Sequence, residues 1–135
     1  GDHRDLHSFP TRRSSDLLTY KIRGCIFEVY KTLGPGLLEV VYRQAMMQEL
    51  KLQGINARQE VSIPVVYKGV DLGLNYRMDI LVEDTVILEL KSVEKLHPVF
   101  FKQLTNYLKL THLPLGLLIN FNTTDVAKEI HRIAN

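Results

Sequence analysis

The segment YRMDILVEDTVILELKSV, from Tyr76 to Val93, constrains the fold more than any other part of the sequence. Two apolar runs flank a short acidic turn, and this arrangement predicts a β-hairpin. If the turn is centred on Asp84, residues at equal distances from it pair, so Asp79 lies directly opposite Glu89. Paired residues in an antiparallel ladder have Cα atoms roughly 4.5–5.5 Å apart. The hairpin therefore brings two carboxylates within a few ångströms of each other.

The charged residues inside these strands need a physical explanation. Side chains alternate between the two faces of a strand, so Glu89 shares a face with Lys91, and Arg77 shares one with Asp79. Like charges directly opposite each other repel, and a divalent cation with oxygen ligands removes that repulsion. A solvated hairpin face, on which Arg77 and Lys91 flank the two acids, explains this segment equally well. The hairpin alone leaves both interpretations open.

Hydrophobic periodicity predicts the remaining elements. We expect helices over residues 19–33, 37–53, 97–111 and 124–133, and strands over residues 55–69, 72–82, 85–93 and 114–121. Pro64 indicates an edge position or a bulge for the first strand. The order is α-α-β-β-β-α-β-α, in which a meander of three strands is followed by a helical crossover. This order predicts an α/β (α+β mixed) fold with a four-stranded mixed sheet flanked by helices.

Residues 1–17, GDHRDLHSFPTRRSSDL, show no hydrophobic period of 2 or 3.6. They resemble the translated read-through of a common sequencing adapter, and a natural tail of mixed charge is the alternative. We expect a non-native, disordered leader and exclude it from the fold prediction. Residues 18–135 then form a single domain, long enough for one modest hydrophobic core.

Composition narrows the class of protein. With 45% hydrophobic and 24% charged residues, the chain is typical of a globular domain. No apolar run approaches the roughly 20 residues that a membrane helix needs, and we expect a cytoplasmic protein. Cys25 is the only cysteine, which excludes an intrachain disulfide and a cysteine-based zinc site; its apolar spacing predicts a buried thiol. The net charge of +2 permits a nucleic-acid partner without requiring one.

Two further motifs accompany the hairpin. Gly36, Glu39 and Tyr42 are spaced as GxxExxY at the start of the second predicted helix. Gln103 and Tyr107 lie four residues apart on the helix after the third strand, so they share one helix face.

Together these motifs resemble the PD-(D/E)xK nuclease superfamily, and closely resemble the small prokaryotic proteins called the GxxExxY family. The superfamily motif matches at Asp79, Glu89 and Lys91, and the glutamine–tyrosine pair is similar to a RecB-like QxxxY motif. Similar segments cover nearly the whole chain after Leu18. One departure is Met78, which stands where the superfamily motif has a proline before the acid.

The resemblance implies a restriction-endonuclease-like core and a divalent-metal-dependent nuclease that hydrolyses phosphodiester bonds, expected in DNA. It implies that Asp79, Glu89 and the backbone carbonyl of Leu90 bind Mg²⁺ or Mn²⁺, with Glu39 as a third carboxylate. Lys91 would orient the attacking water or stabilise the transition state.

The resemblance also implies that Gln103 and Tyr107 line the site and contact the substrate backbone. A homodimer or a larger protein partner is a further expectation. The alternative function is a non-catalytic module that binds nucleic acid or a partner and retains the nuclease fold.

Some of these residues also have a structural explanation. Glu39 can instead be a first-turn acid favoured by the helix dipole. Tyr42 and Tyr107 are expected to pack half-buried with a hydroxyl partner.

Overall fold

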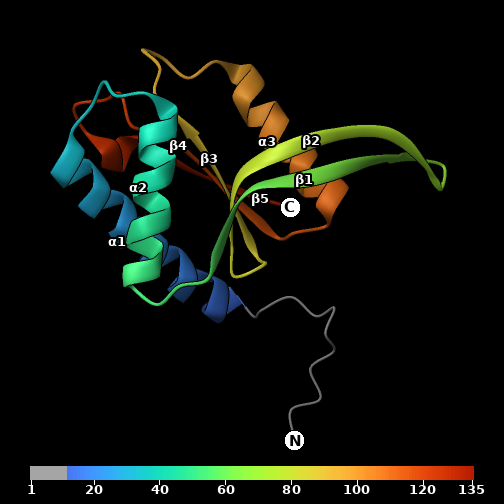
Figure 1. The fold of residues 1–135 in the computed structure, drawn as a ribbon, viewed down its shortest axis with the longest axis horizontal. Helices are drawn as coiled ribbons and strands as arrows, with labels where there is room; N and C mark the ends of the chain where they lie inside the picture. The colour runs from blue at the N-terminus through green and yellow to red at the C-terminus, as the bar shows by residue number, and fades with distance from the viewer. Residues whose placement is uncertain (1–11) are drawn as a thin grey trace, which may run out of the picture.

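The computed structural model describes residues 12–135 (Figure 1). The sheet has five strands in the order β1-β2-β3-β4-β5, and only β3 and β4 run parallel. This mixed sheet with flanking helices confirms the predicted α/β fold class. The elements are α1 (Arg12–Leu33), α2 (Glu39–Leu52), β1 (Ala57–Tyr67), β2 (Val70–Val82), β3 (Val86–Lys91), α3 (Pro98–Thr111), β4 (Leu115–Asn120), the 3₁₀ turn η1 (Val126–Glu129) and β5 (Ile130–Ala134).

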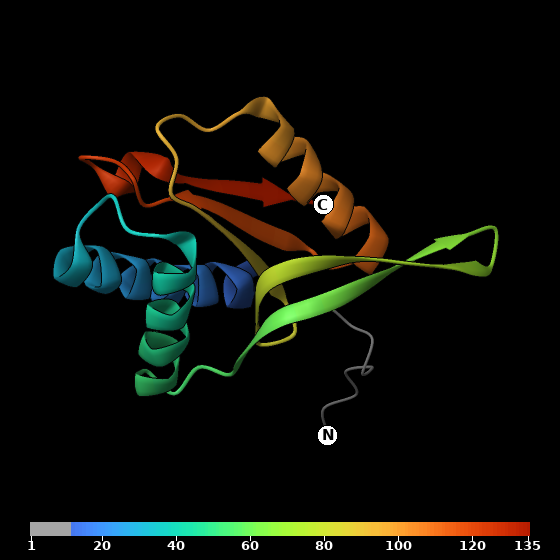
Figure 2. The ribbon, with the colours of Figure 1, turned by 45° about the horizontal axis from the view of Figure 1, so that its top comes forward.

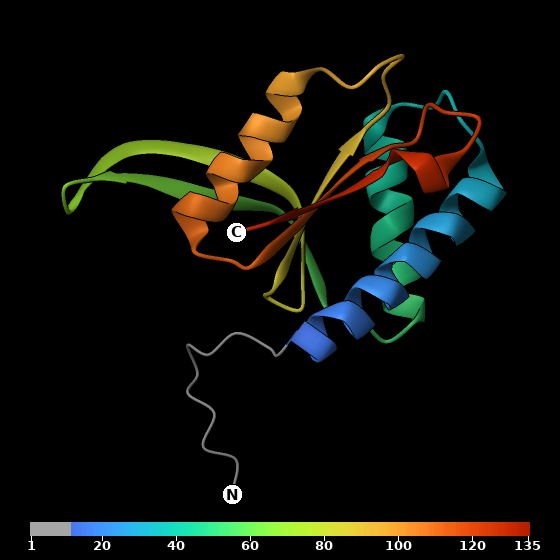
Figure 3. The same cartoon turned by 180° about the vertical axis from the view of Figure 1, so that it is seen from behind.

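Helices cover both faces of the sheet (Figures 2 and 3). Helices α1 and α2 pack on one face, where Leu88 and Leu90 of β3 join a large apolar cluster. Helix α3 packs on the other face, over a smaller cluster that includes Ile87 of the same strand. Strand β3 is therefore buried on both faces, which explains its nearly continuous apolar sequence. Cys25 of α1 is buried in the larger cluster, as expected.

Helix α3 supplies the crossover between the two parallel strands. It begins at Pro98, where the missing N–H costs no helical hydrogen bond. The Nδ1 atom of His97 accepts a hydrogen bond from the N–H of Val99 at 3.0 Å, which caps the first turn. Among residues 12–135, no helix is both long and apolar enough to cross a membrane.

The predicted helix over residues 124–133 is wrong. Only the short η1 turn forms there, with Asp125 as its cap, and the chain then continues as β5. Strand β5 pairs with β4 through partners such as Leu118 with His131. Pairing satisfies the backbone groups along the edge of β4. This pairing stabilises the segment more than a local helix with a few apolar residues at helical spacing would. The sheet consequently has five strands, not the four that we predicted.

Helix α1 begins earlier than the sequence predicts. Residues 12–17 are helical, so the expectation that the leader is disordered is wrong for this part. The Oγ1 atom of Thr19 donates to the Ser15 carbonyl at 2.7 Å, and Asp16 forms an ion pair with Arg132 of β5 at 3.2 Å. The first contact lies within α1, and the ion pair joins the added turns to β5. Residues 1–11 lie outside the described part of the chain, and the non-native origin of the leader stays a prediction.

Strands β1 and β2 extend together as an arm beyond the rest of the sheet (Figures 1 and 2). Lys68 and Gly69 at its tip both have positive φ, as a tight two-residue hairpin turn requires. Strand β1 is an edge strand, and the ladder shifts register beside Pro64, in agreement with the prediction for that proline. The arm exposes large apolar side chains: Val66, Tyr67, Val70, Leu72, Leu74 and Tyr76.

A tight helix–sheet contact provides a test of the fold. A Cβ atom added at Gly116 of β4 would lie 2.8 Å from Cδ1 of Leu104, a side chain of α3 that is fully buried. We expect Gly116→Ala to destabilise the protein by about 1–3 kcal/mol through overpacking, measured by chemical denaturation. The matched control is Gly24→Ala in α1, where an added Cβ meets nothing within 4 Å. That variant should be more stable by about 0.5–1 kcal/mol, and equal effects of the two substitutions would contradict the packing shown.

Candidate active site

The register of the β2–β3 hairpin confirms the sequence prediction. Ile80 pairs with Leu88, and Val82 pairs with Val86, which centres the turn on Asp84. Asp79 is therefore the next residue opposite Glu89. The regular ladder ends just before this pair, where β2 begins to turn away from β3 (Figure 2). The two acids lie at the opening between the strands.

Side chains replace backbone pairing at this opening. The N–H of Leu90 donates to Oδ2 of Asp79 at 2.8 Å, and the N–H of Asp79 donates to Oε1 of Glu89 at 3.1 Å. Each carboxylate thus accepts from the backbone, which fixes its position and satisfies an N–H that the ladder has released. The contact is reciprocal and holds the two carboxylates side by side.

Burial makes this acid pair electrostatically unfavourable. Glu89 is only 5% exposed. Burial, and then the negative charge of Asp79, raises the pKa of Glu89 from an ordinary value of 4.5 to about 8. The hydrogen bond from the Asp79 N–H and the nearby Lys91 charge act in the opposite direction. Two hard oxygen donors crowded in this way are the ligand type that Mg²⁺ and Mn²⁺ prefer, so the residues fit such an ion.

Lys91 lies on the α3 side of the sheet, beyond Glu89 along β3. Its Nζ atom is 4.4 Å from the ring centroid of Phe100, within the range of a cation–π contact. Its carbonyl accepts a hydrogen bond from the N–H of Phe121 at 2.9 Å. The aromatic ring thus holds the ammonium group near the acids. The sequence places Phe100 in the first turn of α3, but no motif marks it as a partner of Lys91.

On α3, Tyr107 lies near the acid pair and Gln103 contacts Tyr107. The Nε2 atom of Gln103 donates to the Tyr107 hydroxyl at 2.8 Å. Tyr107 is 3% exposed, and burial, followed by the charge of Glu89, raises its pKa. Its ring contacts that of Tyr76 on the arm, with centroids 5.5 Å apart. Tyr107 therefore packs with a hydroxyl partner, as the alternative expectation had it, but it is buried rather than half-buried, and it also borders the carboxylates.

Glu39 is not gathered with the other two acids. It is the first residue of α2 and is exposed. Within residues 12–135, no three His, Cys, Asp or Glu side chains lie close enough to form a metal site. The start of α2 is nevertheless attached to the end of β3, because the Oγ atom of Ser92 donates to the Leu37 carbonyl. The metal-ligand role of Glu39 stays a prediction, as does the dipole interpretation.

The contacts of Tyr42 give a structural reason for a tyrosine one helical turn after Glu39. Its ring stacks on that of Phe121, with centroids 4.3 Å apart and planes 5° from parallel. Its hydroxyl donates to the Gly34 carbonyl and accepts from the Leu37 N–H. Tyr42 is fully buried rather than half-buried. It therefore fixes the loop that leads into Glu39, and acts as a positioning residue for the start of α2.

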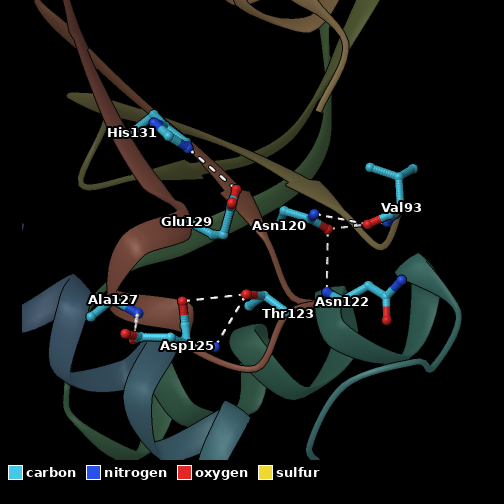
Figure 4. A network of polar contacts seen from close by, with 8 residues as sticks. All are labelled: Val93, Asn120, Asn122, Thr123, Asp125, Ala127, Glu129 and His131. Atoms are coloured by element: carbon cyan, nitrogen blue, oxygen red, sulfur yellow. Dashed lines mark hydrogen bonds and ion pairs between the residues drawn. The ribbon is translucent and has the colours of Figure 1, made fainter. Parts of the chain in front are cut away.

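Asn120 fixes the chain beyond Lys91 (Figure 4). It pairs with Lys91 in the parallel ladder and is 2% exposed. Its Oδ1 atom accepts from the N–H groups of Val93, at 3.0 Å, and Asn122, at 3.2 Å, while its Nδ2 atom donates to the Val93 carbonyl at 2.8 Å. The only signal of this role in the sequence is a polar amide at the end of the apolar run LGLLIN, and no motif marks it.

Comparison with known families adds an independent observation. A family model described as the PD-(D/E)XK nuclease superfamily matches residues 16–133, which is most of the chain. The chain belongs to the PD-(D/E)XK nuclease superfamily. Members of this superfamily are typically nucleases that use divalent metal ions, and the mixed sheet is consistent with their restriction-endonuclease-like fold. Comparisons with curated proteins and with solved structures found no match.

The raised pKa of Glu89 predicts how stability depends on pH in this superfamily member. Unfolded Glu89 ionises near 4.5, whereas the folded protein keeps the proton up to about 8. Because the folded state binds the proton more tightly, the metal-free protein should lose stability as the pH rises through this window. Glu89→Gln mimics the protonated group, so its denaturation midpoint in a chelator should decline less than that of the wild type. Parallel midpoint–pH curves for the two proteins would contradict this assignment.

Proposed function

We propose that the protein is a divalent-metal-dependent nuclease that hydrolyses phosphodiester bonds in DNA. The observation that carries the proposal is the Asp79–Glu89 pair at the opening between β2 and β3. Lys91 lies on the same strand as Glu89, two residues further on. Membership of a nuclease superfamily supports the same chemistry.

The carboxylates of Asp79 and Glu89, with the Leu90 carbonyl, would hold Mg²⁺ or Mn²⁺. When bound, the ion lowers the pKa of a water molecule and neutralises charge on the scissile phosphate. Glu39 would contribute a third carboxylate, either to the same ion through water or to a second ion. Its attachment through Leu37 to Ser92 keeps it near the end of β3.

The other residues hold and orient the reacting groups. Lys91 presents its ammonium group from the ring of Phe100 to the phosphate, where it stabilises the charge that develops during attack. Gln103 and Tyr107 line the α3 side of the opening and contact the substrate backbone. The buried packing of Tyr107 fixes the position of this side of the opening.

We assign the chain to the GxxExxY family on Gly36, Glu39 and Tyr42, with the glutamine–tyrosine pair of α3 as a RecB-like QxxxY motif. A cytoplasmic location, and a homodimer or a larger protein partner, remain predictions.

The second candidate function is a non-catalytic binding module, which is favoured by the separation of Glu39 from the acid pair. Assays on linear, circular and single-stranded DNA and on RNA, with and without Mg²⁺, distinguish the two functions.

Lys91→Ala tests catalysis. We expect this variant to lose at least about a hundredfold in the rate of plasmid nicking with Mg²⁺, because a point charge at the phosphate is removed, while DNA binding stays measurable. Lys109→Ala, on the exposed side of α3, is the matched control and should cut at the wild-type rate. If the wild type and Lys91→Ala behave alike, the protein is not the proposed enzyme.

Asp79→Asn tests the metal ligands. An asparagine can still accept the hydrogen bond from the Leu90 N–H, but it lacks the negative charge that attracts the ion. Calorimetric titration should therefore show weaker Mn²⁺ binding. Asp71→Asn, which removes an exposed carboxylate elsewhere on β2, should leave the titration unchanged. Equal Mn²⁺ affinities for Asp79→Asn and the wild type would exclude Asp79 as a ligand.

A further inference from the structure

Three charged side chains from separate elements meet where α2 contacts β1 and β2. Oε1 of Glu60 on β1 forms ion pairs with Arg43 of α2 at 3.3 Å and with Arg77 of β2 at 3.5 Å. We call Arg43, Glu60 and Arg77 the arginine cluster. One carboxylate faces two guanidinium groups, so the cluster carries an excess positive charge.

The β1–β2 ladder places the arginine cluster next to the candidate active site. Gln59 pairs with Ile80 and Val61 pairs with Met78, so Glu60 lies across from Asp79 in the sheet. On α2, Arg43 follows Glu39 by four residues, which puts both on one face of that helix. Within the sheet, Glu60 is therefore the neighbour of Asp79 on β2, and Arg43 lies one helical turn from Glu39.

Two features of the cluster are unusual for a structural ion pair. Glu60 has a φ of 54°, a left-handed conformation that is strained for a non-glycine residue inside a strand. The Nε atom of Arg43 is buried and has no hydrogen-bond partner in the part of the chain that the structure describes. A guanidinium group has five N–H donors in a fork that matches phosphate oxygens. The single oxygen that both arginines share leaves most of these donors unused.

We propose that Arg43 and Arg77 form a binding site for a backbone phosphate of the nucleic acid, next to the scissile bond, and that Glu60 occupies its place in the free protein. This inference rests on the proposed function for its ligand, a phosphodiester backbone. Two guanidinium groups suit a phosphate better than one lysine would, because each can donate two parallel hydrogen bonds. Displacement of the Glu60 carboxylate would release both arginines for the substrate.

The rival explanation is that the cluster only fastens α2 to the sheet. The two explanations differ in the effect of removing the central charge. If Glu60 competes with a phosphate, Glu60→Gln should strengthen nucleic-acid binding. If Glu60 is structural, the same substitution should weaken binding or leave it unchanged.

The experiment measures the binding of a fluorescein-labelled DNA duplex by anisotropy in EDTA, over a series of salt concentrations. Arg77→Gln should weaken binding about tenfold and lower the slope of log K against log salt by about 1, as expected for the loss of one phosphate contact. Arg43→Gln should act in the same direction, and Glu60→Gln should bind more tightly than the wild type. Circular dichroism and melting midpoints establish that each variant is folded.

Arg58→Gln is the matched control. Arg58 also lies on β1 and pairs with a carboxylate, Asp84, at 2.8 Å, but at the turn of the β2–β3 hairpin. Its loss removes the same charge and should change the affinity less than about twofold. Equal losses for Arg58→Gln and Arg77→Gln, or no measurable binding by the wild type, would overturn the proposal.

Because the readout is binding without metal, the outcome is independent of cleavage. A protein that binds DNA through the arginine cluster but cuts no substrate would sustain this inference and refute the nuclease. If the protein cuts DNA with Mg²⁺ but the Arg77→Gln variant binds DNA like the wild type, the nuclease is supported and this inference is refuted.

Discussion

The reciprocal contact between Asp79 and Glu89 is the interaction on which the candidate site depends. The hairpin register places the two acids opposite each other, and each accepts a hydrogen bond from the backbone of the strand pair. These bonds replace the ladder where β2 leaves β3, so the opening between the strands costs no unsatisfied N–H at this point. Glu89 is buried, Asp79 is half-buried, and the charge of Asp79 raises the pKa of Glu89, which makes the pair poorly suited to a structural role and well suited to an ion.

The rest of the fold holds this pair on rigid elements. Strand β3 is covered on both faces, and α3 brings Phe100 and Tyr107 over the site from one side. Tyr42 and Asn120 fix the two loops that border it, before α2 and after β3. Such buried polar contacts limit the freedom of the chain near the reacting groups. The proposed active site thus has a preorganised frame.

The charges around the opening are segregated. Two carboxylates lie in the gap between the strands, and the arginine cluster lies beside them across β1 and β2. An ion between the acids and a phosphate chain beside it would satisfy both groups at once. The strained conformation of Glu60 falls at the boundary between these two regions, where functional strain is most often found.

The sequence by itself determined the local geometry of the site. The short turn and the alternation of side chains were enough to place Asp79, Glu89 and Lys91. The turn and the alternation are local properties, because each relates residues that are near neighbours in the chain. Helical spacing likewise put Gln103 and Tyr107 on one face. Strand β5 could not be predicted in this way, because it forms only where the edge of β4 offers partners.

Tertiary structure alone decided the contacts between distant segments. Three contacts join residues from different segments of the chain: Phe100 with Lys91, Asn120 with Val93, and Glu60 with two arginines. It also decided that Glu39 stays apart from the acid pair. No period in the sequence encodes these contacts, because they depend on how the helices and the sheet pack and on where the strands diverge.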